Sequence, residues 1–291
     1  MVLRNVNLDD RILGLQQNDD YNFFSKLGTD DEEIIINPYE NIDIKCRYFN
    51  VDETIKHLKS KKGLSILSWN IWSLKKKFNQ FKDFINIFNL EGCFFDIIAL
   101  QEVWCIKNSD FFNIEGYNLI YKSRQQTEGG GVCFYINKQI PYKELKKLST
   151  FEEKLFESIT LELDIGKKDK LIVSNVYRSN CNHPSLTQND QVDRFIEIFS
   201  DLQAKLSNLK PKSYIMGDLN LDLLKFEQHE KTRALLENSF TNGFLELISL
   251  PTRVTNTSAT LIDHFYTNDN NYNYDSSIFR FVILYLRKRG R

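Results

Sequence analysis

The chain has 291 residues, of which 42% are hydrophobic and 13% aromatic, enough apolar mass for one large domain or two small ones. The formal net charge of −1 and the pI near 6.5 exclude a strongly basic surface, so contacts with nucleic acid must come from local patches. No apolar stretch is long enough to span a bilayer, and the acidic N-terminal region does not resemble a secretory signal. Because the five cysteines form no C-x-x-C pair, we expect reduced thiols in an intracellular protein, nuclear or cytoplasmic and not secreted.

Two regions are expected along the chain. Residues 1–62 are polar and rich in Asn and Asp, and they are predicted to be a mostly disordered or loosely docked leader. A folded domain is predicted over residues 63–291. Its strand-like runs and helical spacings alternate, and several strands follow one another directly, which predicts an α/β sandwich with mixed sheets. The expected strands are residues 64–69, 96–100, 132–136, 159–163, 171–176 and 213–216, and the expected helices are residues 78–90, 191–206 and 231–240.

Asp218 and Asn220 follow the strand predicted at residues 213–216 and are the most informative pair of the sequence. In an extended segment, residues i and i+2 point to the same face, so a carboxylate and an amide would lie side by side at a strand end. Such a pair can accept a proton from water while orienting a phosphate. The alternative is an ordinary turn, because Gly, Asp and Asn all favour turns.

Other predicted strands also end in polar side chains. Asn70 ends the strand at 64–69, Glu102 follows the strand at 96–100, and Tyr177 and Arg178 follow the strand at 171–176. Asp263 comes after another apolar pair. Each has an ordinary alternative: a helix cap for Asn70, a surface acid for Glu102, a core aromatic for Tyr177 and an ion pair for Asp263. Their joint occurrence favours a site.

Hydrolysis of a phosphodiester fits this set of side chains. Mg²⁺, or alternatively Mn²⁺, needs only one or two carboxylates and keeps several waters, and Glu102 with Asn70 are the candidate ligands. Asp218 is the candidate base for the attacking water. Charge building on the phosphate needs donors, for which Tyr177, Asn220 and Arg178 are candidates. Lys75, followed by Lys76 and Lys77, is a candidate contact to DNA, and a solvated helix start is the alternative.

Six short motifs occur in the order typical of the endonuclease/exonuclease/phosphatase superfamily. They are Ser68-Trp69-Asn70-Ile71, Gln101-Glu102, Gly129-Gly130-Gly131-Val132, Asn175-Val176-Tyr177-Arg178, Gly217-Asp218-Leu219-Asn220 and Ile262-Asp263. The segments Pro251-Thr252-Arg253 and Thr260-Leu261-Ile262-Asp263-His264 resemble those of the apurinic-type endonuclease domains of non-LTR, LINE-like retrotransposons. The resemblance covers residues 63–268 and, more weakly, the leader.

The resemblance implies a four-layer α/β (α+β) sandwich of two mixed β-sheets flanked by helices. It also implies Mg²⁺-dependent nicking of double-stranded DNA by a monomer, with a reverse transcriptase domain in the parent element. Carried over, Asn70 and Glu102 lie at the metal, Tyr177 contacts phosphate, Asp218 acts on water, Asn220 holds phosphate, and Asp263 supports the site.

The C-terminal region departs from this family pattern. The family ends in a Ser-Asp-His motif that the chain lacks, and His264 stands in the earlier motif, where it is expected to be structural. We therefore expect the domain to be incomplete or divergent after about residue 268, with little or no nuclease activity. Two other functions stay open: another phosphodiesterase or phosphatase of the superfamily, and a non-catalytic DNA-binding remnant.

Overall fold

The computed structural model describes residues 45–60, 63–166, 169–255, 257–269, 274–279 and 282–288. Two seven-stranded sheets and four α-helices make up most of this part of the chain. The helices are α3 (Val51–Ser60), α4 (Leu74–Leu90), α5 (Gln188–Ser207) and α6 (Glu230–Thr241). Short 3₁₀ turns lie at Ser109–Phe112, Lys146–Leu148 and Leu223–Lys225.

The first sheet has the strand order β1-β15-β16-β2-β3-β5-β4. The pairs β1–β15 and β2–β3 are parallel and the others are antiparallel, so the sheet is mixed. Its strands are β1 (Lys45–Tyr48), β2 (Gly63–Asn70), β3 (Ile97–Gln101), β4 (Tyr117–Lys122), β5 (Val132–Asn137), β15 (Tyr274–Phe279) and β16 (Val282–Lys288).

The second sheet has the order β11-β14-β10-β9-β8-β6, with β7 also paired to β8. It too is mixed, since β9 and β10 are parallel and their outer neighbours are antiparallel. Its strands are β6 (Tyr142–Glu144), β7 (Phe151–Glu152), β8 (Phe156–Asp164), β9 (Lys170–Tyr177), β10 (Lys212–Asp218), β11 (Leu245–Glu246) and β14 (Asp263–Thr267). A separate ribbon pairs β12 (Arg253–Val254) with β13 (Ala259–Thr260).

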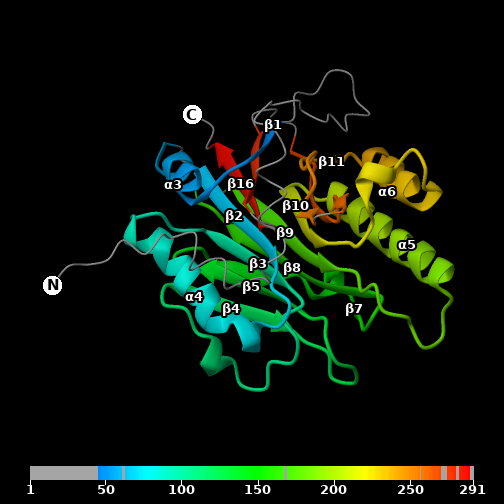
Figure 1. The fold of residues 1–291 in the computed structure, drawn as a ribbon, viewed down its shortest axis with the longest axis horizontal. Coiled ribbons are helices and arrows are strands. Elements are labelled where there is room, and N and C mark those ends of the chain that lie inside the picture. The colour runs from blue at the N-terminus through cyan, green and yellow to red at the C-terminus, as the bar shows by residue number, and fades with distance from the viewer. Residues whose placement is uncertain are drawn as a thin grey trace.

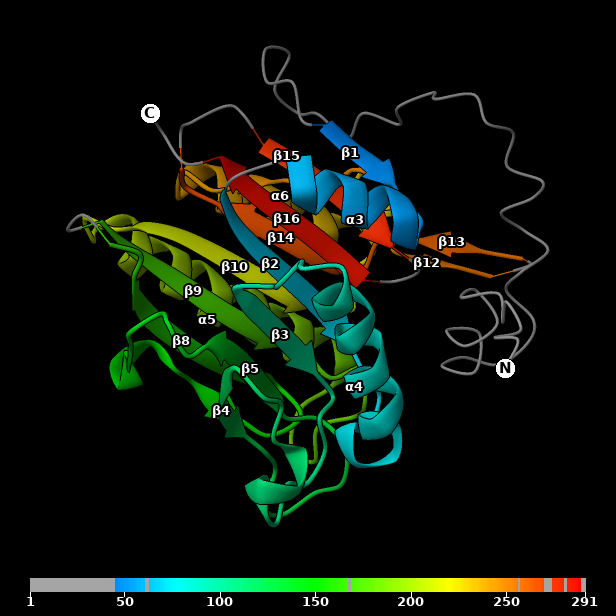
Figure 2. The ribbon, with the colours of Figure 1, turned by 90° about the vertical axis from the view of Figure 1, so that its left-hand side faces the viewer.

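The elements form four layers, with the two sheets packed face to face and helices on both outer faces (Figures 1 and 2). One apolar cluster joins α3 and α4 to the first sheet, a second fills the space between the sheets, and a third joins α5 and α6 to the second sheet. The helices are amphipathic for this reason: α4 buries Phe81, Phe84, Ile85 and Phe88 on one face. The predicted four-layer α/β fold is confirmed.

Residues 45–60 differ from the expected disordered leader. Residues 45–48 form β1, which pairs with β15, and residues 51–60 form α3. Val51, Ile55 and Leu58 pack into the cluster that α4 shares with the first sheet, so burial of this apolar stripe outweighs the polar composition. Residues 1–44 lie outside the described part of the chain.

The segment after residue 268 also belongs to the fold. β15 and β16 form a hairpin, and β16 pairs with β2 over seven residues, so the tail completes the first sheet. Among the described residues, no helix has both the length and the apolar character that a membrane crossing requires.

Candidate active site

Polar side chains at the ends of strands from both sheets meet at one edge of the sandwich. Asn70 is the last residue of β2 and Glu102 follows β3, which runs parallel to β2. In the second sheet, Tyr177 ends β9, Asp218 ends β10, and the first residue of β14, Asp263, lies opposite Asp218. The parallel pairs place these ends on the same side, so the structure brings the predicted residues together.

Hydrogen bonds join the two halves of the site. The Asn70 side-chain amide donates to Glu102 Oε1 at 2.9 Å and to Asp218 Oδ2 at 2.7 Å. The Tyr177 hydroxyl donates to the same Glu102 oxygen at 3.0 Å. One amide therefore fixes a carboxylate from each sheet.

Asp218 and Asn220 lie in a turn, contrary to the expected extended pair. β10 ends at Asp218, and Asn220 has a φ of 50°, so the alternation of side chains along a strand does not apply to it. The Asn220 backbone N–H donates to Asp218 Oδ1 at 2.9 Å, which is the hydrogen bond of an Asx turn. The turn and the site are the same feature, because the turn orients the Asp218 carboxylate.

Arg178 does not have the place expected of a DNA-facing cation. Its side chain is buried, and its guanidinium donates to the carbonyl oxygens of Leu219 and Asn220, each at 2.6 Å. The Asn220 side chain in turn donates to the Arg178 carbonyl at 2.7 Å. Arg178 is therefore a positioning residue that holds the Asp218–Asn220 turn.

Replacing Arg178 with Ala is expected to lower the free energy of unfolding by about 3 kcal/mol, because two buried carbonyls lose charged donors. Urea denaturation measures this change. Arg194, whose exposed guanidinium pairs with Glu197, gives the matched control, and its replacement with Ala should leave the stability nearly unchanged. Unchanged stability with weaker DNA binding would restore the original assignment of Arg178.

Negative charge is concentrated at this edge. Burial raises the pKa of Asp218, and the neighbouring carboxylates of Asp263 and Glu102 raise it further. Burial also raises the pKa of Asp263, with Glu102 adding to the effect. The buried Tyr177 hydroxyl has a raised pKa as well, again with Glu102 and Asp218 contributing. A bound cation would relieve this repulsion.

The residues fit a hard divalent cation held mainly by water. Glu102 Oε2 accepts no hydrogen bond from the described residues, whereas Oε1 accepts two. Asn70 Oδ1 is partly engaged, because the Trp72 backbone N–H donates to it at 3.1 Å. The described residues form no cage of three or more His, Cys, Asp or Glu ligands. Mg²⁺ suits such a site, since it retains waters around one or two carboxylates.

Strained backbone is concentrated around the same edge. Six non-glycine residues of the described chain have a positive φ, and five of them lie in the three loops that carry the site. Each left-handed residue costs about 1–2 kcal/mol, so the surrounding contacts must hold these loops in place. The five residues are Trp72, Ser73, Glu102, Trp104 and Asn220.

Two supporting groups were not given a role from the sequence. Below the site, Gln101 donates to Asn175 Oδ1 at 2.7 Å, and Asn175 donates to the carbonyls of Leu100 and Cys133. This buried bridge ties β3 to β9. Polar residues inside the apolar runs at 97–103 and 171–177 were the signal that could have revealed it.

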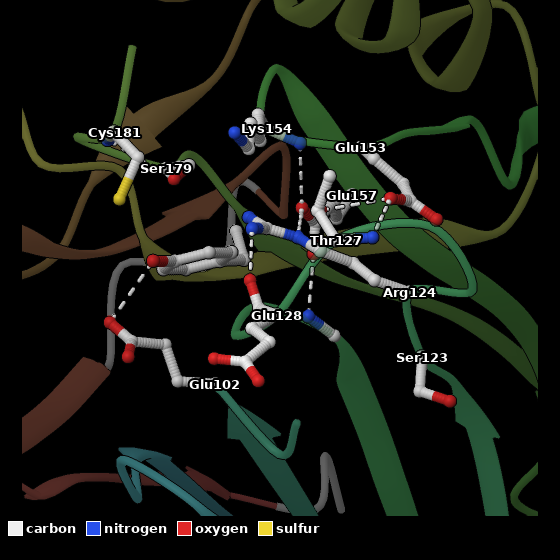
Figure 3. A network of polar contacts seen from close by, with 12 residues as sticks. Glu102, Ser123, Arg124, Thr127, Glu128, Glu153, Lys154, Glu157, Ser179 and Cys181 are labelled. Carbon is white, nitrogen blue, oxygen red and sulfur yellow. Dashed lines mark hydrogen bonds and ion pairs between the residues drawn. The ribbon is translucent and has the colours of Figure 1, made fainter. Parts of the chain in front are cut away.

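The second group is a buried ion pair between Arg124 and Glu157 (Figure 3). Arg124 Nε lies 2.6 Å from Glu157 Oε1, and Glu157 Oε2 accepts the Gly131 backbone N–H. A side chain at Gly130 would collide with both charged groups, so only glycine allows the loop to close over the pair. The ion pair thus holds the glycine loop at residues 129–131. This loop contacts the loop that carries Glu102, since the Trp104 N–H donates to the Gly130 carbonyl.

His264 is structural, as expected. Its ring is fully buried, with Nε2 2.9 Å from the Leu221 carbonyl and Nδ1 3.2 Å from the Tyr266 hydroxyl. Lys75, by contrast, is exposed near the start of α4 and is free to meet a substrate.

The fold and the site together define a class of proteins. Its members are two-sheet sandwiches in which a side-chain amide links two carboxylates at one edge. The chain belongs to the endonuclease/exonuclease/phosphatase family, whose sequence model matches residues 67–279. No curated protein matches the chain by sequence.

Solved structures share the fold at low sequence identity. The AP endonuclease LMAP from Leishmania major has a TM-score of 0.64 and 10% identity, covering 98% of this chain and 100% of that one. The catalytic domain of APE2 from Xenopus laevis has a TM-score of 0.59 and 18% identity, covering 77% and 92%. The 3′ phosphatase NExo from Neisseria, bound to a product DNA hairpin, has a TM-score of 0.56 and 13% identity, covering 78% and 100%.

Proposed function

We propose that this chain is a Mg²⁺-dependent DNA phosphodiester hydrolase of the retrotransposon type, which nicks double-stranded DNA slowly. The single observation that carries the proposal is the Asn70 amide, which links Asp218 of one sheet to Glu102 of the other. In this proposal Asp218 is the proton acceptor and Glu102 is the metal-binding carboxylate, one on either side of the Asn70 amide. DNA-processing relatives with the same fold support the choice of substrate.

Each side chain has a separate role in the proposed reaction. Asp218 takes the proton of the attacking water, since the Asn70 amide and the Asn220 N–H hold its carboxylate at the site. When substrate binds, the Tyr177 hydroxyl would turn from Glu102 toward the phosphate, and Asn220 would donate the amide hydrogen that the Arg178 carbonyl does not take. Asp263 supplies the neighbouring charge that raises the affinity of Asp218 for a proton. Glu102, with Asn70, holds Mg²⁺ or Mn²⁺, which when bound neutralises charge on the phosphate.

Slow cleavage follows from the absence of the Ser-Asp-His motif of the resembling domains. The sequence contains no such triplet, and its last histidine is His264, whose buried ring contacts the Leu221 carbonyl and the Tyr266 hydroxyl. Loss of one transition-state donor costs about 10²–10³ in rate, which sets the expected deficit.

Conversion of supercoiled plasmid to the nicked circle tests the proposal. With Mg²⁺ we expect slow nicking that stops with EDTA, at a rate about 10²–10³ below that of an enzyme with a complete donor set. Absence of any Mg²⁺-dependent nicking at high protein concentration would contradict the hydrolase and favour the non-catalytic alternative.

Mg²⁺ should also stabilise the protein measurably. A ligand present at 100 times its Kd adds about 2.7 kcal/mol to the stability, and a thermal melt detects such a shift. Glu102→Gln should remove most of the shift, because it neutralises the candidate ligand and keeps its shape. Glu115→Gln, at an exposed position, is the control and should retain it. An equal shift in both variants would place the cation elsewhere.

A non-catalytic DNA-binding module is the second candidate, and the missing histidine favours it. It predicts DNA binding with a steep salt dependence and no cleavage. Hydrolysis of lipid or nucleotide phosphates is the third candidate, and a comparison of plasmid with sphingomyelin and inositol phosphates separates it from the first.

The proposal extends to the oligomeric state, the location and the parent element of this chain. We propose a monomer that acts inside the cell, nuclear or cytoplasmic, with a reverse transcriptase domain encoded in the parent element. All five cysteines are free thiols, which supports a reducing compartment.

A further inference from the structure

Two tryptophans lie next to the two candidate metal residues. Trp72 is two residues after Asn70, and Trp104 is two residues after Glu102. Their loops run side by side, since the Ser73 N–H donates to the Glu102 carbonyl at 2.7 Å and the Leu74 N–H to the Val103 carbonyl at 3.2 Å. The backbones that carry the two tryptophans therefore lie next to each other at the site, with the Trp72 side chain exposed and the Trp104 side chain half-buried.

Folding alone gives no reason for Trp72 to be tryptophan. Its side chain is 62% exposed, and its backbone has a φ of 47°, which a bulky residue rarely adopts. An exposed indole on a strained backbone adds little to the core. Strained residues of this kind collect at binding sites, where the surrounding contacts hold them ready for a ligand.

Two consecutive lysines accompany the rings. Lys77 Nζ lies 5.5 Å from the centroid of Trp72, and Lys76 Nζ lies 5.0 Å from the centroid of Trp104. Burial lowers the pKa of Lys77, and the nearby Glu102 carboxylate opposes this shift. The surface thus combines flat apolar faces with positive charge, immediately beside the site.

We propose that Trp72 and Trp104, with Lys76 and Lys77, form a stacking surface for an unpaired nucleotide of DNA next to the cleavage position. Indole faces stack on any base, and the lysines neutralise the adjoining phosphates. Bases inside a duplex already stack on one another and offer no free face. DNA with unpaired nucleotides is therefore the preferred substrate, which refines the proposed function and rests on it for the identity of the ligand.

Fluorescence anisotropy with labelled oligonucleotides in EDTA measures binding without cleavage. Three ligands are compared: a single strand, a blunt duplex and a duplex containing a short gap. The variants are Trp72→Ala, Trp72→Phe and the control Phe94→Ala. Phe94 is also an exposed aromatic, at 57%, but it precedes β3 and so lies at the opposite end of that strand from Glu102.

Trp72→Ala is expected to weaken binding of the single strand and the gapped duplex by about 5- to 150-fold, the range for one stacked base. Trp72→Phe should retain most of the affinity, and Phe94→Ala should bind like the wild type. The blunt duplex should bind equally to all variants. Single-stranded DNA should also quench the tryptophan fluorescence of the wild type, and less so that of Trp72→Ala, because Trp69 is buried.

Equal affinity of Trp72→Ala and wild type for the single strand would overturn the proposal, and so would an equal loss on the blunt duplex. Failure to bind any DNA would overturn it as well, and would leave the surface to a protein partner. The two proposals fail separately. Binding of single strands that depends on Trp72, without nicking, removes only the hydrolase. Nicking with no effect of Trp72 on binding removes only the stacking surface.

Discussion

Asp218→Asn is expected to reduce the nicking of supercoiled plasmid by about 10²–10⁴-fold, the usual contribution of a positioned general base. The amide that replaces the carboxylate has the same shape and can still accept the hydrogen bond from Asn70. It cannot accept a proton from water. Gel assays of nicked and supercoiled plasmid over time give the rate.

Stability should change much less than activity. Burial raises the pKa of Asp218, so the folded state disfavours its charged form at neutral pH, where the unfolded chain would be ionised. A neutral Asn removes this penalty, but its NH2 group cannot accept the hydrogen bond that the Asn220 N–H donates to the carboxylate. The two effects oppose each other, so the free energy of unfolding should stay close to that of the wild type while activity falls. A fall in both would mean that Asp218 acts mainly as a structural residue.

Asp269→Asn is the matched control for Asp218→Asn. Asp269 is buried like Asp218, and it accepts a hydrogen bond from the Tyr214 hydroxyl at 3.0 Å. It follows the end of β14, whereas the site lies at the beginning of that strand. Nicking by this variant should match that of the wild type. An equal loss in both variants would point to a general effect of buried aspartates on the fold.

Gly217→Ala is expected to destabilise the fold by about 5 kcal/mol or more, at the extreme of single substitutions. Gly217 has a φ of 147°, and an added Cβ would lie 1.7 Å from the Val176 carbonyl oxygen. That oxygen belongs to β9. Because β9 is hydrogen-bonded between β8 and β10, its backbone cannot move away from the added Cβ. Since a domain is stable by only about 5–15 kcal/mol, this loss removes about a third or more of the total stability.

Gly243→Ala separates the collision from the backbone preference. Gly243 also has a positive φ, 76°, but an added Cβ meets nothing within 4 Å. Gly243→Ala should lower the free energy of unfolding by about 1 kcal/mol, from backbone strain alone. Circular dichroism during urea denaturation compares the two variants. Similar losses in both would show that strain, and not the Val176 carbonyl, decides the effect at Gly217.

The regular elements were largely predictable because their signals are local. The apolar spacing of α4 and α5 and the buried runs of β2, β3 and β10 stand in the sequence itself. Residues 45–60 were not predictable in the same way. Their polar composition hides the short stripe of α3, whose burial depends on α4, a helix that follows it in the chain.

The site residues were predictable in kind, but their contacts were not. Asn70, Glu102, Tyr177, Asp218 and Asp263 could be chosen because each closes an apolar run. Asn220 and Arg178 were placed wrongly in geometry. A left-handed backbone and a buried guanidinium bound to carbonyls are set by neighbouring chain segments, which leave no trace in residue spacing.

By itself, the sequence determined the layered α/β class and the polar residues at the strand ends, because periodicity and chain order are local properties. Only the tertiary structure decided that Asn70 joins Asp218 to Glu102 across the two sheets. Asp218 is 148 positions from Asn70 in the sequence, and Glu102 is 32 positions from it. It also decided that Arg178 supports the turn and that the loops carrying Trp72 and Trp104 run side by side. Contacts between distant segments depend on how the sheets pack, and packing is a property of the whole chain.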